Sequence, residues 1–442
     1  MYFMNHTLII YSVTQACVFN ESNICLKPID IKEKSRRYFI KMAMFSNTTA
    51  DFETFNSKLF TQINRQNSDE NIFFSPASIA LAISMCTIGA RNETLQQMLN
   101  VFEASSIQQI TKTAEQIMHV FSSANKDKKV QLKLANRLYA QKDYKLQGEY
   151  LSLVQKSFQA DIKLEDFQNQ SEKVVQTINA WVEEQTNTLI RNLLTKSDVT
   201  NDTRLILVNC IYFKGAWINP FDKYLTDAKA NFYEANGKVT KISLMHQTDQ
   251  FQYNEDKSLG VQMIHLPYEN SNSKDAFVFS VILPDKNVRL EDVEQKLTVN
   301  PQLMKQTLNL NSAKSRTIEL YLPKFKMESK FQLNYVLIQL GMSNAFQSQV
   351  ADFSGIVSRE DARNGLYISK VIHKAFISVD EEGSEAAAAT AIIMVDECCM
   401  MRDVEELIKF RIDRPFLFAI QEARSGLVLF QGKFLTTTQL SN

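Results

Sequence analysis

The segment that decides the fold is EEGSEAAAATA, residues 381–391, in which one glycine precedes a run of very small side chains. Successive side chains of an extended chain point to opposite faces, so the even positions 384–392 share one face and Glu385 lies on the other. A segment that inserts between two strands needs small side chains on its buried face and no proline, which would remove a ladder donor. Gly383 can act as the hinge, because glycine accepts unusual dihedral angles. The segment therefore has the pattern of a strand that can insert into a sheet.

The same residues also fit the start of a helix. Ser384 would be the N-cap, and the alanines behind it have the highest helix propensity. Short runs of this kind do not distinguish a helix from a strand, so the rest of the chain has to decide.

Further motifs accompany this segment along the chain. They are NIFFSPAS (71–78), GA (89–90), NRL (136–138), INAWV (178–182), LVNCIYFKGAW (207–217), ILPD (282–285), LPKF (322–325), LGM (340–342), ADFS (351–354), DRPFLF (413–418) and LVLFQGKF (427–434). In this order they resemble the serpins, a family of suicide protease inhibitors, and in particular its intracellular ovalbumin-like branch. The resemblance covers residues 43–438, and the ordered set is very specific although each motif alone is weak.

The resemblance implies an α+β fold with three β-sheets, eight or nine helices and an exposed reactive-centre loop. Apolar spacing predicts helices at 52–65, 76–87, 171–194 and 331–340, the third with Ser171 as a candidate cap. Aromatic and β-branched residues predict strands at 205–213, 277–283, 317–322, 367–379 and 416–421. With no internal repeat or low-complexity linker in the sequence, we expect a single serpin domain at 42–442.

Composition is that of a large globular protein. Hydrophobic residues make up 45% and charged residues 22%, and the formal net charge is zero. A neutral chain has no overall attraction to nucleic acid or membrane, and no run of about 18 apolar residues predicts a transmembrane helix. The resemblance to serpins implies a target protease as the partner, and we expect a monomeric protein with no cofactor or metal.

Residues 1–41 precede the resemblance and lack a globular pattern. We expect them to be disordered or an artefact of the gene model, with Met42 or Met44 as the start. Cys398 and Cys399 are adjacent in the expected loop, and free thiols there favour a reducing cytoplasm. Secretion is the alternative, because residues 8–19 resemble a signal-peptide core, although polar residues dilute it.

The resemblance assigns two sets of residues to the movement of the sheet. The hinge set is Glu382, Gly383, Ser384, Glu385, Ala386, Ala387, Ala388, Ala389 and Thr390. The sheet-opening set is Ser75, Ser78, Asn209, His373 and Trp217. In serpins the first four of these positions meet beneath the centre of the main sheet, and Trp217 matches an aromatic residue at its upper end. Without the resemblance, Ser75 would be only a helix cap before Pro76 and His373 only a hydrogen-bonded core residue.

The scissile bond of inhibitory serpins usually lies after the fourteenth residue beyond the hinge glycine. Here that bond is Glu397-Cys398, in the sequence IMVDECCM (393–400), which resembles the reactive loop of the cytosolic granzyme B inhibitor. A protease pocket that accepts a glutamate should contain Arg or Lys, as in granzyme-like enzymes. Caspases would fit a cut after Asp396, and trypsin-like enzymes a cut after Arg402. Arg402 is 19 residues past the hinge, a segment too long to be drawn taut on insertion.

The resemblance implies that the cleaved loop inserts as a new central strand while the protease remains attached as an acyl-enzyme. A non-inhibitory serpin, acting as chaperone, carrier or storage protein, is the alternative, but proline or charge would then be expected in the hinge. An enzyme using Cys398 or Cys399 with a histidine is disfavoured, because no catalytic signature surrounds them. A glycosaminoglycan site is conceivable at Lys126, Lys128 and Lys129, although such charge runs are usually solvated surface.

Overall fold

The structure is a computed structural model that describes residues 52–126, 129–270, 276–300, 302–358, 360–361, 365–384 and 407–438. The described helices are α2 (Glu53–Gln66), α3 (Pro76–Gly89), α4 (Asn92–Val101), α5 (Ile107–Lys126), α6 (Gly148–Phe158), α7 (Ser171–Gln185), α8 (Leu290–Val299), α9 (Gln302–Thr307) and α10 (Asn334–Leu340). None of the helices in these ranges combines the length and hydropathy needed to cross a membrane.

The strands form a six-stranded and a nine-stranded sheet. The six-stranded sheet runs in the order β10 (Phe325–Gln332), β11 (Ile368–Val379), β12 (Gly383–Ser384), β4 (Leu205–Ala216), β2 (Val130–Gln141) and β3 (Asp161–Glu165). The other runs in the order β1 (Ile72–Phe74), β15 (Val428–Phe434), β14 (Phe416–Glu422), β8 (Phe277–Pro284), β7 (Val261–Pro267), β6 (Val239–Asp256), β9 (Lys314–Pro323) and β13 (Ile408–Arg411), with β5 (Asp227–Tyr233) paired to β6.

The fold class is α+β, as predicted. The three expected sheets appear as two hydrogen-bonded networks, because the long strand β6 pairs with β7 near its end and with β5 and β9 over the rest of its length. One strand therefore joins what would otherwise be two separate sheets.

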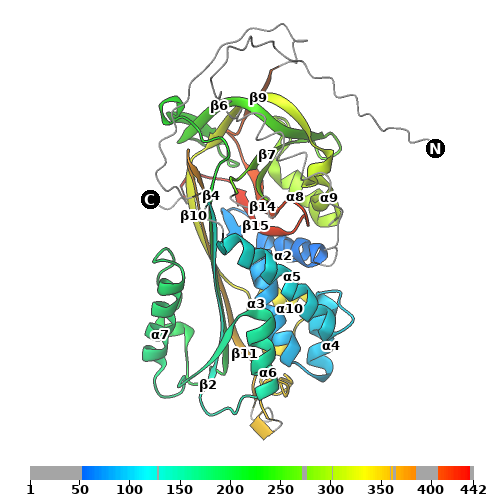
Figure 1. Ribbon diagram of the computed structural model, residues 1–442, viewed down its shortest axis with the longest axis vertical. Helices are drawn as coiled ribbons and strands as arrows, with labels where there is room; N and C mark the ends of the chain where they lie inside the picture. The colour runs from blue at the N-terminus through cyan, green and yellow to red at the C-terminus, as the bar shows by residue number, and fades with distance from the viewer. Residues whose placement is uncertain are drawn as a thin grey trace, which may run out of the picture.

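The six-stranded sheet is covered on both faces, as Figure 1 shows: α7 lies on one face, and α3, α5 and α6 lie on the other. We call the α7 side the front face and the other side the back face. Ile206, Val208 and Cys210 of β4 belong to an apolar cluster with α7, whereas Leu205, Leu207 and Ile211 belong to the main core. Burial on both faces explains why β4 is a nearly continuous apolar run.

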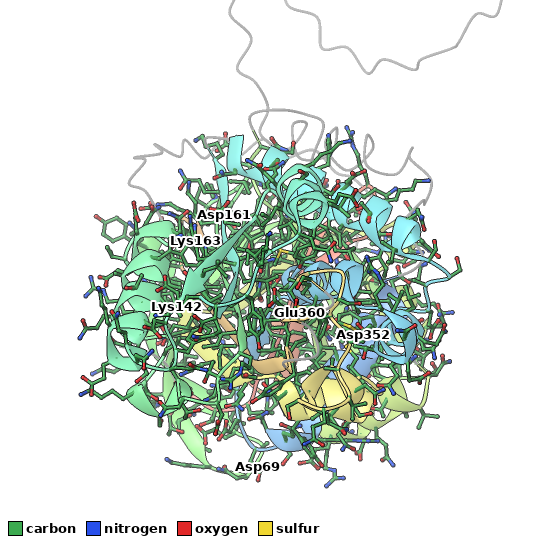
Figure 2. The ribbon with its side chains drawn as sticks, turned by 90° about the horizontal axis from the view of Figure 1, so that it is seen from below. Asp69, Lys142, Asp161, Lys163, Asp352 and Glu360 are labelled. Atoms are coloured by element: carbon green, nitrogen blue, oxygen red, sulfur yellow. The ribbon has the colours of Figure 1, made fainter. Side chains whose placement is uncertain are left out.

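The outer edge of this sheet is charged. Strand β3 ends the sheet and carries Asp161 and Lys163, which are labelled close together with Lys142 nearby in Figure 2. Asp161 pairs with Arg137 of β2 at 3.2 Å, and Lys142 pairs with Asp166 at 2.8 Å. Charged side chains on an edge strand oppose pairing with another chain.

The predicted strands at 205–213, 277–283, 317–322, 367–379 and 416–421 all coincide with strands of the structure, and so do most predicted helices. The helix expected at 171–194 ends at Gln185, because Asn187 and Thr188 adopt positive φ angles of 50° and 66°. Its predicted cap is also wrong: Gln170 is the N-cap and Ser171 is already helical. The first residues of the helix expected at 331–340 belong to β10.

Candidate functional site

The candidate site is the seam between β4 and β11, the two central strands of the six-stranded sheet. They pair in parallel from Ile368 opposite Leu205 to Phe376 opposite Tyr212. Beyond that point β12 lies between them, with Gly383 opposite Ala216 and Ser384 opposite both Gly215 and Val379. Gly383 and Ser384 therefore already occupy the first positions of an additional strand.

Gly383 fits this position only because it has no side chain. Its φ is 154°, and a Cβ there would lie 2.0 Å from the carbonyl oxygen of Gly215. A tight turn precedes it, since the Asp380 amide donates to the Gly383 carbonyl (2.8 Å) and the Asp380 carboxylate accepts from the amides of Glu382 (3.0 Å) and Gly383 (3.2 Å). Any larger residue would push the hinge out of the seam.

Ser384 is fully buried on the back face. Its hydroxyl lies 2.6 Å from the hydroxyl of Tyr268, which is also fully buried. Burial raises the pKa of Tyr268, so the phenol remains neutral and available for this hydrogen bond. The structure places Trp217 here as well: its ring stacks on Tyr268 at 4.6 Å, and its Nε1 donates to the carbonyl of Asp380 at 2.9 Å.

Two acids before the glycine are held by ion pairs. Glu381, only 3% exposed, accepts from Lys324 (2.6 Å) and from the Thr226 hydroxyl (2.9 Å). Burial alone would raise the pKa of Glu381, but these hydrogen bonds hold it below its ordinary value. Glu382 pairs with Lys223 at 2.6 Å. The base of the hinge is therefore attached to the strands around the seam.

The four remaining predicted sheet-opening residues form one buried cluster beneath the seam. Ser75 caps α3 by accepting from the Ser78 amide (3.2 Å), and the Ser78 hydroxyl donates to Asn209 Oδ1 (3.0 Å). Asn209 and His373 are direct partners in the β4–β11 register, and their side chains approach to 2.5 Å. A strand inserted at this level would separate them.

The protonation of His373 follows from its partners. The Ser75 amide donates to Nε2 (3.1 Å), so Nδ1 carries the proton and donates to Asn209. Burial lowers the pKa of the imidazole to about 3, so His373 is neutral near pH 7.

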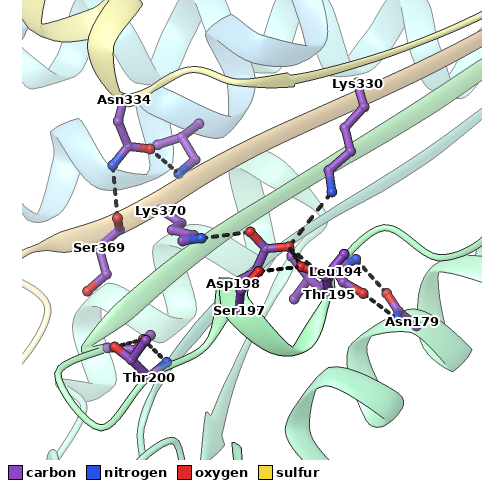
Figure 3. A network of polar contacts seen from close by, with 12 residues as sticks. Asn179, Leu194, Thr195, Ser197, Asp198, Thr200, Lys330, Asn334, Ser369 and Lys370 are labelled. Carbon is purple, nitrogen blue, oxygen red and sulfur yellow. Dashed lines mark hydrogen bonds and ion pairs between the residues drawn. The ribbon is translucent and has the colours of Figure 1, made fainter. Parts of the chain in front are cut away.

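A polar link that the sequence did not reveal crosses the seam on the front face. Asp198 lies in the linker between α7 and β4, and it accepts from Lys370 of β11 at 2.7 Å and lies 3.8 Å from Lys330 of β10 (Figure 3). Burial would raise the pKa of Asp198, but hydrogen bonds from Lys370 and Thr195 lower it to about 2. Lys374 of β11 donates to the carbonyl of Arg191 in the same linker at 2.8 Å.

Several predicted residues lie outside the described part of the chain. They are Glu385, Ala386, Ala387, Ala388, Ala389, Thr390, Asp396, Glu397, Cys398, Cys399, Arg402 and Lys128. The chain is described again from residue 407, and β13 begins at Ile408. Within the described ranges no group of His, Cys, Asp or Glu has the arrangement of a metal site.

Comparison with known proteins gives a consistent result. The family model "Serpin (serine protease inhibitor)" matches residues 50–437. Human Serpin B4 is 35% identical, with 85% of this chain and 96% of that protein covered, and human leukocyte elastase inhibitor is 36% identical with the same coverage. The structure is also similar to a thyroxine-binding globulin complex with thyroxine, with a TM-score of 0.75 at 27% identity, covering 88% of this chain and 99% of that one.

Proposed function

Because the chain belongs to the serpin family, we propose that it is a suicide inhibitor that traps a serine or cysteine protease after cleavage at Glu397-Cys398. The observation that carries the proposal is β12, which lies between β11 and β4 and begins the strand that insertion would complete. The absence of proline and of bulky or charged side chains at positions 386–391 permits the strand to continue.

Before the loop moves, the catalytic groups of the protease carry out the reaction. Its nucleophile bonds to the carbonyl carbon of Glu397, the bond to the Cys398 nitrogen breaks, and the proton of the nucleophile passes to the leaving amine. Insertion then has to outrun hydrolysis of the acyl-enzyme. The attached protease is displaced with the loop, and a misplacement of about 1 Å in its catalytic groups can cost about a hundredfold in rate.

Opening of the seam is assigned to the predicted sheet-opening residues. The hydrogen bond between Asn209 and His373 spans the seam, and both residues also bond to the N-terminal turn of α3 at Ser75 and Ser78. Insertion would break the side-chain bond between Asn209 and His373, so the cluster can tolerate an open sheet only if its members find new partners. The stacked rings of Trp217 and Tyr268 lie at the entrance to the seam, at its upper end.

The target is a protease with an acidic primary specificity. Its pocket would contain Arg or Lys, because a desolvated glutamate needs a cationic partner. A granzyme-like serine protease fits Glu397, and a caspase fits a cut after Asp396. The adjacent thiols of Cys398 and Cys399 favour action of a monomeric inhibitor in the cytoplasm, with secretion as the alternative.

A carrier function is the second candidate. It is favoured by the similarity to thyroxine-binding globulin, which is described as a complex with thyroxine. A carrier has no need of strand insertion, so formation of a covalent protease complex separates the two functions.

The test is incubation of the purified chain with granzyme-like, caspase, trypsin-like and elastase-like proteases, followed by denaturing gels and mass spectrometry of the cut. We expect an SDS-resistant complex and a new C-terminus at Glu397. Glu397→Gln should slow complex formation by roughly 30-fold to several thousandfold, because a buried cation left without its partner costs about 2–5 kcal/mol. Arg402→Ala is the control and should change little. The reverse result would move the scissile bond to Arg402.

A further inference from the structure

Three lysines lie on the front face of the six-stranded sheet near the entrance to the seam. Lys214 belongs to β4, Lys133 to β2 and Lys326 to β10. Tyr212, two residues before Lys214, accepts from Asn187 of the α7 linker, which places these alternate residues of β4 on the front face.

The register places the other two lysines on the same face. Lys133 is opposite Tyr212 in the β2–β4 pair. Lys326 is opposite Ser378 in the β10–β11 pair, two residues from Glu328, which pairs with the linker-bound Lys374. The front face therefore carries one lysine on each of β4, β2 and β10 near the level at which β12 ends.

These lysines have no counter-charge among the described residues. Three acids near the entrance are already paired with other lysines, Glu381 with Lys324, Glu382 with Lys223, and Glu269 with Lys129, and the Asp380 carboxylate accepts from the amides of the turn. A carboxylate that entered the seam on the front face would therefore meet cations that form no ion pair within the described part of the chain.

The register of β12 identifies that carboxylate. Ser384 lies opposite Gly215 on β4 and opposite Val379 on β11. If an inserted strand kept the same antiparallel register, its next residue, Glu385, would come opposite Lys214 on one side and Ser378 on the other. Because Ser384 faces Tyr268 at the back, the alternation of an extended strand would then turn Glu385 to the front.

We propose that Lys214, flanked by Lys133 and Lys326, receives the carboxylate of Glu385 when the strand begins to insert. This proposal rests on the proposed function, and it names the residues that position the strand at the start of insertion. Glu385 is the only charged residue at positions 385–395, so a single cationic site serves the whole insertion. Without it, a carboxylate would enter the sheet with no partner, which disfavours insertion relative to hydrolysis.

The test is the number of inhibitor molecules consumed for each protease trapped. Lys214→Glu places like charges opposite each other and should raise this number about fivefold, which is about 1 kcal/mol at about 1.4 kcal/mol per factor of ten. Glu385→Lys should have a similar effect. The double variant with Lys214→Glu and Glu385→Lys should return to within about twofold of the original chain, because the pair is restored with reversed charges.

Two controls separate pairing from structural damage. Lys163→Glu makes the same change of charge on edge strand β3 of the same sheet and should leave the number unchanged. The rate of the first loop cleavage, measured with excess protease, should be the same in all variants, since Lys214 acts only after acylation.

The outcomes distinguish this proposal from the proposed function. If the original chain traps proteases but the double variant performs no better than the single ones, the pairing is wrong and the inhibitory function stands. If the original chain forms no complex with any protease and gains no thermal stability when its loop is cut, both fail.

Discussion

At the scale of single residues, the site depends on which face of a strand each side chain takes. Gly383 is required because the Gly215 carbonyl occupies the place of a Cβ, and Ser384 is required to be small because it is enclosed at the back beside Tyr268. Continuing this alternation, Ala386 would face the main core opposite Phe213, and Ala387 would face the front opposite Tyr212.

Ala386→Arg should convert the inhibitor into a substrate. An unpaired cation would be forced toward the core side of the sheet, where its desolvation opposes insertion. The protease should then cut the loop and leave without an SDS-resistant complex. Ala387→Arg is the matched control, and it should retain more complex because its side chain would turn to the front face, where Tyr212 meets the polar side chain of Asn187. Equal effects of the two variants would mean that the faces are assigned wrongly.

Acid should destabilise the protein through its buried histidines. Burial lowers the pKa of both His373 and His265 to about 3, from an ordinary value of 6.5. Between these values the unfolded chain binds protons that the folded chain does not, so the free energy of unfolding falls as pH falls. The stabilisation is complete above about pH 6.5 and declines by up to about 1.4 kcal/mol per pH unit for each histidine.

Urea unfolding between pH 4.5 and 7.5 measures this effect. In a His265→Gln variant, the pH dependence of the free energy of unfolding that remains is the contribution of His373. The ion pair of Asp198 is lost only near its pKa of about 2, well below this window. A flat profile between pH 4.5 and 6.5 would show that the histidines are not buried in their neutral form.

At the scale of elements, we expect the linker after α7 to oppose opening of the seam. It leads into β4, yet it is attached to β11 and β10 on the far side of the seam through Asp198 and the Arg191 carbonyl. An inserted strand moves β11 away from β4 by about 4.8 Å, the usual strand spacing. These contacts must therefore break or the linker must shift before insertion can proceed.

Asp198→Asn should make the seam open more readily. It removes the charge that Lys370 needs and should lower the free energy of unfolding by about 1–3 kcal/mol. Hydrogen exchange of the β4 and β11 amides should accelerate more than exchange in the nine-stranded sheet. Asp161→Asn removes the exposed pair with Arg137 and should cost less than about 1 kcal/mol. Unchanged exchange along the seam would exclude a role for the linker in holding it closed.

At the scale of the whole molecule, the uncleaved fold has a central seam that must separate before it can receive one more strand. Parallel pairing of β4 and β11 satisfies the backbone below the seam entrance, and β12 begins the antiparallel arrangement above it. Complete insertion would replace one parallel ladder with two antiparallel ladders, which are slightly more stable per residue.

Cleavage of the loop near residue 397 should therefore raise the melting temperature. The gain comes from the added ladder and from burial of the alanine face. Calorimetry before and after confirmed cleavage measures it, with Ala386→Arg as a control that should be cleaved without the full gain. An unchanged melting temperature in the original chain would support the carrier alternative.

The sequence by itself determined the family, the α+β class and most strands, and it indicated an extended segment at Gly383 and Ser384, where β12 lies. These features depend on local pattern: apolar runs that mark strands buried on both faces, and a glycine followed by small residues in period two. The helix expected at 171–194 was too long for the same reason, because Ile190, Leu193 and Leu194 continue an apolar pattern although they pack on the sheet as linker.

Only the tertiary structure decided which distant groups meet. Tyr268 lies 116 residues from Ser384 along the chain, and Asp198 lies 172 residues from Lys370. Periodicity tells which face a side chain takes, but a partner on another element depends on strand order and register. The register of β12 is the clearest case, because the proposed meeting of Glu385 with Lys214 follows from how Gly383 and Ser384 lie between β11 and β4, and no local pattern contains that register.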